Sequence, residues 1–234
     1  MKAIVFGGSG FVGSHVADIL SEAGHQVKIF DLKSSPYLRP DQEMISGDIL
    51  NKQLVEEAIH GCEVVYNMAG IADLDDASTR PLDTLTQNVL GNTIILEACV
   101  SAHVKRFIYA STVYVYSDKG GFYRCSKQAS ETYIEEFQRQ YGLDFTILRY
   151  GTLYGPRADE RNSIYRYLYQ ALKDGKITVP GTGEEYREYI HVRDAARLSL
   201  EILDEKYAIK HEIDFFAHRA LYSIVWSAVK EGGV

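Results

Sequence analysis

Short apolar runs alternate with amphipathic runs along the first 150 residues of the chain. The apolar runs have the length of buried strands, and the amphipathic runs have the period of helices that cover a sheet. This alternation predicts βαβ units and a parallel sheet. Strands are predicted at 2–6, 26–30, 44–46, 63–66, 106–110 and 145–148, and helices at 11–23, 52–59, 81–102 and 123–141.

The pattern changes after Tyr150. Glycine, proline and charged residues interrupt the segment 151–160, and a helix near 163–173 and short extended pieces near Ile177 and Tyr189 are expected to follow. We therefore expect an α/β fold, with a doubly wound parallel sheet over residues 1–150 and a small second lobe over residues 151–234.

Composition and charge narrow the class of protein. Hydrophobic residues make up 46% and charged residues 24% of the chain, as in ordinary globular domains. The formal net charge of −7 argues against a nucleic-acid partner, which requires a basic face. The chain starts directly on a predicted strand without a signal-peptide pattern, and no apolar run has the length of a membrane span. The three cysteines are odd in number and lack CxxC spacing, so we expect free thiols in a cytoplasmic protein.

A glycine-rich turn joins the first predicted strand to the first predicted helix. It reads GGSGFVG over residues 7–13 and contains GxGxxG. Glycines let the backbone turn sharply and approach a pyrophosphate, and the helix N-terminus offers free N–H groups to phosphates. The strand–turn–helix context predicts a Rossmann-type dinucleotide-binding domain. The residues expected at the cofactor are Gly7, Gly10, Phe11, Val12 and Gly13.

Asp31 follows the second predicted strand, about twenty residues after the glycines. A carboxylate at this position accepts hydrogen bonds from the adenosine ribose hydroxyls and repels a 2′-phosphate. The sequence therefore predicts NAD rather than NADP as the cofactor, although Lys33 lies close by.

A second motif, YxxxK, begins at Tyr123 and ends at Lys127. Its i, i+4 spacing puts the phenol and the ammonium group on one face of a helix. A nearby cation lowers the pKa of a phenol, so we expect Tyr123 to act as a base near neutral pH. Thr112, at the end of the preceding strand, could hydrogen-bond the reacting oxygen beside Tyr123.

With these motifs the chain resembles the extended short-chain dehydrogenase/reductase family, in particular its NAD-dependent nucleotide-sugar epimerases and dehydratases. The resemblance covers roughly residues 1–203. Its motifs occur in family order: GGSGFVGSH (7–15), GDI (47–49), NMAG (67–70), NVLG (88–91), VKRFIYAST (104–112) with VY (115–116), YxxxK (123–127), LRY (148–150), YGPR (154–157) and REYIHV (187–192).

The resemblance implies a role for each matching residue. Thr112, Tyr123 and Lys127 would be catalytic, and Thr112, Asn162 and Arg187 would contact a nucleotide-sugar substrate. A guanidinium group such as that of Arg187 also suits a pyrophosphate on chemical grounds. The remaining cofactor contacts implied are Asp48, Ile49, Met68, Ala69, Gly70, Asn88, Ser111, Tyr123, Lys127 and Tyr150. A homodimer built from the helices at 81–102 and 123–141 is implied as well.

The chain also departs from the family pattern. Thr152 stands where sugar epimerases often have a diphosphate-binding Asn, and the link from Tyr116 to Tyr123 is short. The chain ends 42 residues after the REYIHV motif, so the substrate lobe is expected to be shortened. The sugar 4,6-dehydratases carry an Asp-Glu pair after the catalytic Thr, where this chain has Val113 and Tyr114.

We therefore expect an epimerase-like oxidoreductase that removes hydride from a sugar hydroxyl carbon and returns it, without 4,6-dehydration. Two alternatives remain open from the sequence. One is an NAD-dependent dehydrogenase or reductase of a smaller alcohol or ketone, which would release NADH stoichiometrically. The other is a non-catalytic NAD-binding regulatory protein. No metal is expected, since the cluster Asp73, Asp75 and Asp76 is interpreted as a solvated loop.

Overall fold

The computed structural model describes residues 1–179, 186–204, 207, 212–215 and 219–221, and the chain forms two compact units. The first unit contains Met1–Arg149 and Ala196–Asp214. The second contains Tyr150–Ala195 and the described residues from Phe215 onward. The chain thus passes from the first unit to the second after Arg149 and returns to the first at Ala196.

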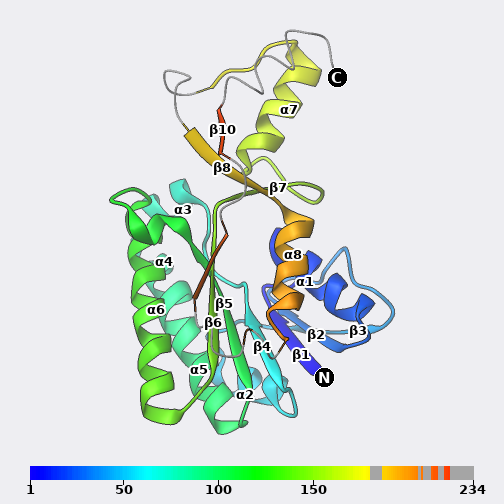
Figure 1. Ribbon diagram of the computed structural model, residues 1–234, viewed down its shortest axis with the longest axis vertical. Coiled ribbons are helices and arrows are strands. Elements are labelled where there is room, and N and C mark those ends of the chain that lie inside the picture. Colours follow the sequence, from blue (N-terminus) through cyan, green and yellow to red (C-terminus); the bar gives the residue numbers. More distant parts are fainter. Residues whose placement is uncertain (180–185, 205–206, 208–211, 216–218, 222–234) are drawn as a thin grey trace. The chain divides into compact units, whose positions relative to one another are not determined.

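A seven-stranded sheet forms the centre of the first unit (Figure 1). The strand order is β3-β2-β1-β4-β5-β6-β9, and β1 pairs in parallel with both β2 and β4. This is the doubly wound order expected from the sequence. The strands are β1 (Lys2–Phe6), β2 (Gln26–Asp31), β3 (Gln42–Ser46), β4 (Val64–Asn67), β5 (Arg106–Thr112), β6 (Phe145–Tyr150) and β9 (Glu212–Phe215).

The helices confirm the predicted alternation, with one interruption. α1 (Phe11–Glu22), α2 (Lys52–Ile59) and α6 (Gly121–Tyr141) match the predicted helices closely. The helix expected over 81–102 is instead a run of α4 (Pro81–Leu85), the π-helix η1 (Thr86–Leu90) and α5 (Gly91–Ser101). Apolar periodicity does not reveal a π-turn, because it changes the backbone hydrogen bonds without ending the helix. The short helix α3 (Leu74–Thr79) is not predicted by the sequence pattern either.

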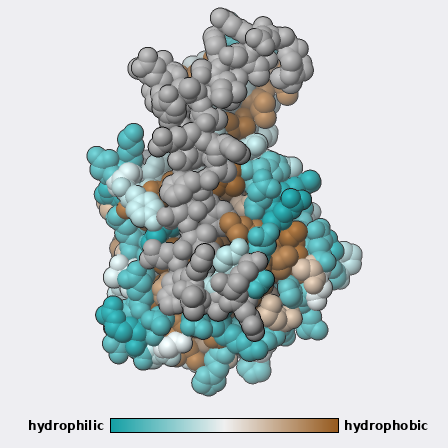
Figure 2. Space-filling view, in the orientation of Figure 1, coloured by the Kyte–Doolittle hydropathy of each residue, from teal (hydrophilic) through white to brown (hydrophobic). Residues whose placement is uncertain are grey.

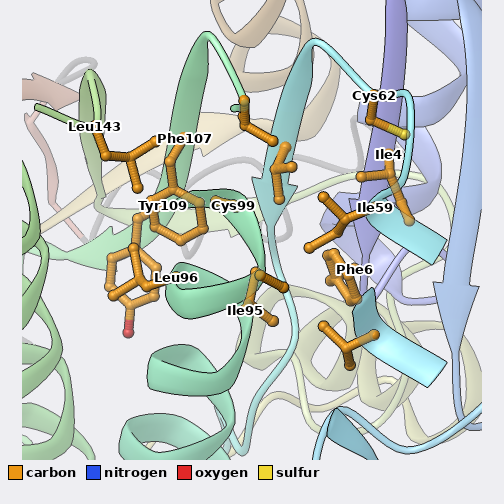
Figure 3. Packing of buried hydrophobic residues seen from close by; sticks show 14 of the residues in the cluster. Ile4, Phe6, Ile59, Cys62, Ile95, Leu96, Cys99, Phe107, Tyr109 and Leu143 are labelled. Atoms are coloured by element: carbon orange, nitrogen blue, oxygen red, sulfur yellow. The ribbon is translucent and has the colours of Figure 1, made fainter. Parts of the chain in front are cut away.

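The inner strands β1, β4 and β5 are buried on both faces, which explains their continuous apolar sequences. On one face, Ile4 and Phe6 of β1 and Phe107 and Tyr109 of β5 pack in one cluster with α5 (Figure 3). On the other face, the Tyr66 hydroxyl donates a hydrogen bond of 2.7 Å to the Ser199 carbonyl. Ser199 belongs to α8 (Val192–Glu201), so the part of this helix after residue 195 covers the sheet.

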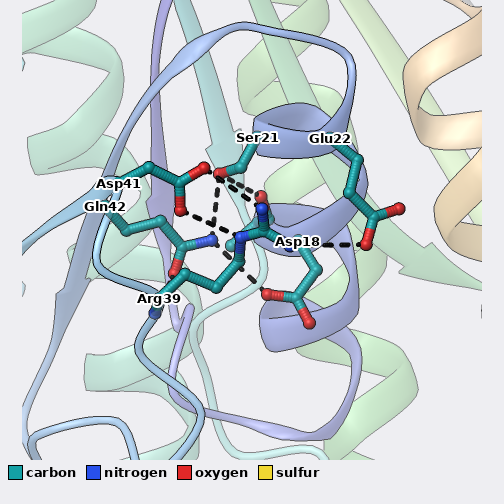
Figure 4. A network of polar contacts seen from close by, with 7 residues as sticks. Asp18, Ser21, Glu22, Arg39, Asp41 and Gln42 are labelled. Atoms are coloured by element: carbon teal, nitrogen blue, oxygen red, sulfur yellow. Dashed lines mark hydrogen bonds and ion pairs between the residues drawn. The ribbon is translucent and has the colours of Figure 1, made fainter.

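A polar network fixes the link between β2 and β3 against α1 (Figure 4). Arg39 forms ion pairs with Asp41 at 2.9 Å and with Glu22 at 3.4 Å. The side-chain amide of Gln42 donates to the Ser21 hydroxyl at 3.0 Å. The exposed ion pairs contribute little stability each, whereas the buried Gln42–Ser21 bond connects the first residue of β3 to α1.

The second unit contains a three-stranded sheet of order β10-β8-β7 and the helix α7 (Ser163–Asp174). Its strands are β7 (Thr152–Tyr154), β8 (Tyr186–His191) and β10 (Arg219–Leu221). The extended piece expected near Tyr189 is β8, whereas no strand forms at Ile177. β7 pairs in parallel with β8, with Leu153 opposite Ile190.

The described surface carries mostly hydrophilic side chains in the view of Figure 2, with smaller hydrophobic patches between them. Among the described helices, none combines the length and the apolarity that crossing a bilayer requires.

Candidate active site

The sheet places the predicted motifs at its switch point, where the strand order reverses between β1 and β4. Ligands of doubly wound sheets bind beyond the carboxyl ends of the strands at such a point. β1 ends at Phe6, directly before the glycine turn, and β4 ends at Asn67, directly before Met68. Because both strands run in parallel, the glycine turn and the segment 68–70 lie at the same edge of the sheet.

The glycines of the turn are required by close packing. Gly7 has a φ of +74°, and a Cβ there would lie 2.7 Å from the Ala69 backbone nitrogen. A Cβ on Gly13 would collide with the Gly7 carbonyl. A Cβ on Gly10 would touch only the Gly7 carbonyl, at 3.2 Å, so a side chain there would fill open space before the helix.

Helix α1 begins directly behind this open space. Gly10 is its N-cap and has no side chain to cap the helix. The backbone N–H groups of Phe11, Val12 and Gly13 lie in the first turn, where no helical carbonyl precedes them. The N–H groups without a helical acceptor, the helix dipole and the space that a side chain would fill together fit the pyrophosphate of a dinucleotide.

Asp31 ends β2 beside the same turn. Its carboxylate accepts hydrogen bonds from the Ser9 backbone N–H at 3.1 Å and from the Lys33 backbone N–H at 3.3 Å. These two bonds fix the carboxylate next to the glycine turn and leave acceptor capacity on both oxygens. The position fits the ribose contact predicted from the sequence.

The structure also describes the surroundings of the other residues that are predicted to line the cofactor groove. Asp48 accepts a hydrogen bond from the Leu50 backbone N–H, and the Ile49 side chain is buried against Gly91. Met68 and Ala69 are half-buried and follow β4. Gly70, with φ +142°, is exposed.

Asn88 of η1 holds the loop after β4 in place. Its amide oxygen accepts from the Ile71 backbone N–H at 2.7 Å, and its amide nitrogen donates to the Ile71 carbonyl at 3.0 Å. The amide nitrogen also donates to the Ser126 hydroxyl at 2.9 Å. Asn88 is 2% exposed, so these bonds join η1, the loop and α6 inside the protein.

Thr112 and Tyr123 lie next to each other, as the sequence predicts. Thr112 ends β5 and is buried, while Tyr123 is in the first turn of α6 and is half-buried. Burial raises the pKa of Tyr123 to about 12, and a hydrogen bond with the Thr112 hydroxyl opposes this rise. The expectation that Lys127 lowers this pKa toward neutrality is therefore wrong for the protein alone, because the removal of water from the phenol dominates.

Lys127 is buried one turn after Tyr123. Its ammonium group donates a hydrogen bond of 2.7 Å to the Ala110 carbonyl and lies 4.6 Å from the centre of the Tyr109 ring. It is 5.7 Å from the centre of the Tyr123 ring. Burial lowers the pKa of Lys127 to about 8, and the charge of Glu131 opposes this shift.

A buried ion pair lies one helical turn beyond Lys127. The sequence motifs do not single it out. Glu131 on α6 pairs with Arg149 on β6 at 2.7 Å, and both side chains are less than 10% exposed. The Ser111 hydroxyl donates to the Glu131 carboxylate. Arg149 also donates to the Tyr116 hydroxyl at 2.6 Å. The i, i+4 spacing from Lys127 to Glu131 is the signal that could have identified this carboxylate.

The remaining predicted residues belong to the second unit: Asn162 and Arg187, expected at the substrate, and Tyr150, expected at the cofactor. Asn162 is the N-cap of α7: its amide oxygen accepts from the backbone N–H groups of Ile164 and Tyr165, and its amide nitrogen donates to the Leu153 carbonyl. Tyr150 is buried at the end of β6. The backbone of Arg187 lies in β8, but its side chain falls outside the described residues.

The acidic cluster after β4 has a structural explanation. Asp73 is the N-cap of α3, and its carboxylate accepts hydrogen bonds from the backbone N–H groups of Asp75 and Asp76. No group of three His, Cys, Asp or Glu side chains suited to a metal ion occurs in the described part of the chain.

Comparisons with known proteins agree with this geometry. The family model described as the NAD-dependent epimerase/dehydratase family matches residues 3–216. A UDP-N-acetyl-alpha-D-glucosaminuronate decarboxylase from Bacillus cytotoxicus is 30% identical over 88% of this chain and 72% of its own length.

Two solved structures are also similar. A UDP-glucose 4-epimerase from Thermotoga maritima, in complex with UDP-glucose, is 27% identical with a TM-score of 0.89, over 99% of this chain and 82% of that chain. A UDP-glucuronic acid 4-epimerase from Bacillus cereus, in complex with UDP-glucuronic acid and NAD, is 25% identical with a TM-score of 0.90, over 100% of this chain and 84% of that chain.

Proposed function

The chain belongs to the NAD-dependent epimerase/dehydratase family, and from that premise we propose that it epimerises a nucleotide sugar. It is thus an NAD-dependent enzyme of the extended short-chain dehydrogenase/reductase type, as the sequence predicts. The observation that carries the proposed reaction is the contact of Tyr123 with Thr112 at the end of β5, with Lys127 one turn further along α6.

The three side chains have distinct tasks in this proposal. Thr112 hydrogen-bonds the sugar oxygen and orients it toward Tyr123. Tyr123 removes the proton from that hydroxyl and later returns it to the oxygen. Lys127, held by the Ala110 carbonyl, keeps a positive charge near the phenol and binds the nicotinamide ribose. Bound NAD supplies the hydride acceptor and a positively charged ring, which lowers the pKa of a neighbouring phenol.

The reaction type follows from the residues beside Thr112. The 3₁₀ helix η2 (Val113–Tyr116) comes directly after it. Elimination of water from a keto sugar requires a proton donor and a base, and Val113 can be neither. Tyr114 offers a phenol, which is a poor substitute for a carboxylate as a general base. Removal and return of hydride, by contrast, require only Thr112, Tyr123 and Lys127.

Substrate contacts, assembly and location also remain proposals. Asn162 and Arg187 would contact the nucleotide diphosphate, and a homodimer would form through α4, α5 and α6, as the family resemblance implies. A cytoplasmic location is supported by the free thiols of Cys62, Cys99 and Cys125.

The test is an incubation of the protein with NAD and a panel of UDP- and dTDP-sugars, including uronic acids, followed by NMR and mass spectrometry. We expect an epimer of unchanged mass from at least one sugar. A product lighter by one water would show dehydration, and loss of CO₂ from a uronic acid would show decarboxylation; either would contradict the proposal. Stoichiometric NADH would indicate a net dehydrogenase, and binding of NAD without any turnover would indicate a regulatory protein.

A further inference from the structure

Two consecutive residues near the end of β5, Ala110 and Ser111, form hydrogen bonds with side chains of helix α6. Lys127 donates its hydrogen bond to the carbonyl of Ala110. The hydroxyl of Ser111 donates to Glu131, one helical turn further along α6. Thr112, the next residue of β5, then meets Tyr123, one turn before Lys127. Side chains from three successive turns of α6 therefore contact the last three residues of β5, although not in the same order along the two elements.

Glu131 occupies the end of this arrangement that is farthest from the reacting groups. It is 7% exposed and accepts from Ser111 and from Arg149, whose Nε and Nη2 atoms approach its two oxygens at 2.7–3.2 Å. Arg149 is in turn bonded to the Tyr116 hydroxyl, and its guanidinium lies 5.1 Å from the centre of the Tyr116 ring. The carboxylate is therefore held from β5, β6 and, through Arg149, from η2.

A buried charge pair is a poor means of stabilising a protein, because desolvation offsets most of the attraction. A pair of hydrophobic residues would stabilise this position at least as well. Glu131 lies one helical turn after Lys127 and accepts a hydrogen bond from Ser111, the residue before Thr112. This position suggests a role at the reacting groups and not in stability.

We propose that Glu131 is a positioning residue that fixes the register of α6 against β5, so that Lys127 and Tyr123 face the residues they act on, and that Arg149 holds Glu131 in place. This rests on the proposed function, in which these two residues act on the substrate oxygen and the cofactor. The groups that face Lys127 are Tyr109 from β5 and Tyr123 and Glu131 from α6, with Arg149 of β6 behind Glu131.

The test requires no substrate in its first part. The protein is labelled with ¹³Cε-lysine, and the Lys127 signal, identified by its absence in Lys127→Met, is titrated by NMR. Glu131→Gln should lower the Lys127 midpoint by about one pH unit, because the carboxylate that favours the ammonium form is lost. Glu131→Asp should recover part of the shift. Ile134→Val, a buried core change on the same helix, should leave the midpoint in place.

Glu131→Gln leaves Arg149 without its ionic partner, so a double variant, Glu131→Gln with Arg149→Met, removes both buried charges. It should fold, and its Lys127 midpoint should lie between those of Glu131→Gln and the wild type, because loss of the more distant Arg149 cation offsets part of the effect of losing the carboxylate. If both variants fold and titrate like the wild type, the proposal is wrong.

The second part measures turnover of whichever sugar the panel identifies. Glu131→Gln and the double variant should each reduce kcat by about 10- to 100-fold with little change in KM. A misplaced reacting group lowers the rate of the chemical step more than the affinity for the substrate. Unchanged kcat in the folded double variant would also overturn the proposal. If no sugar is turned over, the proposed function fails, and the NMR titration still decides the role of Glu131.

Discussion

Asp31 illustrates how a single side chain is predictable from its position. A strand–glycine turn–helix pattern fixes where the second strand ends, so an acidic residue there can be assigned from the sequence alone. The structure adds that Ser9 and Lys33 hold the carboxylate through their backbone N–H groups. Tyr123 shows the limit of this reasoning: spacing predicts its neighbours, but its raised pKa depends on burial by distant segments.

The cofactor preference should depend on Asp31. Asp31→Ala removes the ribose acceptor and the negative charge that repels a 2′-phosphate. NAD binding should therefore weaken, and the difference in affinity between NAD and NADP should become smaller. Calorimetric titration with both dinucleotides measures this difference. Asp41→Ala, which removes an exposed carboxylate at the opposite end of the β2–β3 pair, serves as the control and should leave the difference in affinity between NAD and NADP unchanged. Wild-type protein that bound NADP as tightly as NAD would rule out this role for Asp31.

Tyr123→Phe should reduce turnover by about 10²- to 10⁴-fold, the usual contribution of acid–base catalysis, and leave NAD binding nearly intact. Single-turnover kinetics together with NAD calorimetry separate the two effects. Tyr133→Phe, an exposed change on the same helix, provides the control. Near-normal turnover by the Tyr123 variant would exclude Tyr123 as the base.

The buried ammonium of Lys127 should cost stability. Its folded-state pKa of about 8 lies below the reference value of 10.5, so the unfolded chain binds more protons between these values and stability rises with pH there. Lys127→Met should therefore increase the free energy of unfolding by about 1–3 kcal/mol at pH 7, and the gain should shrink as the pH rises beyond about 8. Urea unfolding at pH 7, 8 and 9 measures this. A gain that grew with pH would show that Lys127 is not destabilised by burial.

Elements are predictable where burial gives them a strong pattern. β1, β2, β5 and α2 follow directly from apolar runs and helical periodicity. Sequence patterns miss η1, because its π-turn leaves the helix unbroken, and they miss α3, a short helix that begins at an Asp73 cap and has a single buried residue. They miss the Glu131–Arg149 pair for another reason, because its partners lie 18 residues apart on different elements.

Asn88 should stabilise the packing of η1 against the loop that follows β4. Asn88→Ala leaves the Ile71 backbone groups and the Ser126 hydroxyl without this partner, and each buried group left unpaired costs about 1–3 kcal/mol. Urea unfolding measures the loss against Leu90→Ala, an exposed change in the same π-helix, which should stay within about 0.5 kcal/mol of wild type. Equal stability of the two variants would show that the network contributes nothing.

For the whole molecule, the sequence predicts the doubly wound sheet and the family, because the motifs fall at the ends of predicted strands. It does not predict that the chain returns to the first unit after residue 195. That return depends on long-range contacts such as the hydrogen bond from Arg106 to the Ile202 carbonyl. Local patterning carries no information about such contacts.

The removal and return of hydride is the central claim, and an isotope experiment tests it most directly. The protein is incubated with NAD and its sugar nucleotide in D₂O, and the epimer is analysed by NMR and mass spectrometry. Because the hydride leaves and returns without exchange with water, the inverted carbon should carry no deuterium, and the ratio of NAD to NADH should not change. Deuterium at the inverted carbon, or net formation of NADH, would contradict the account.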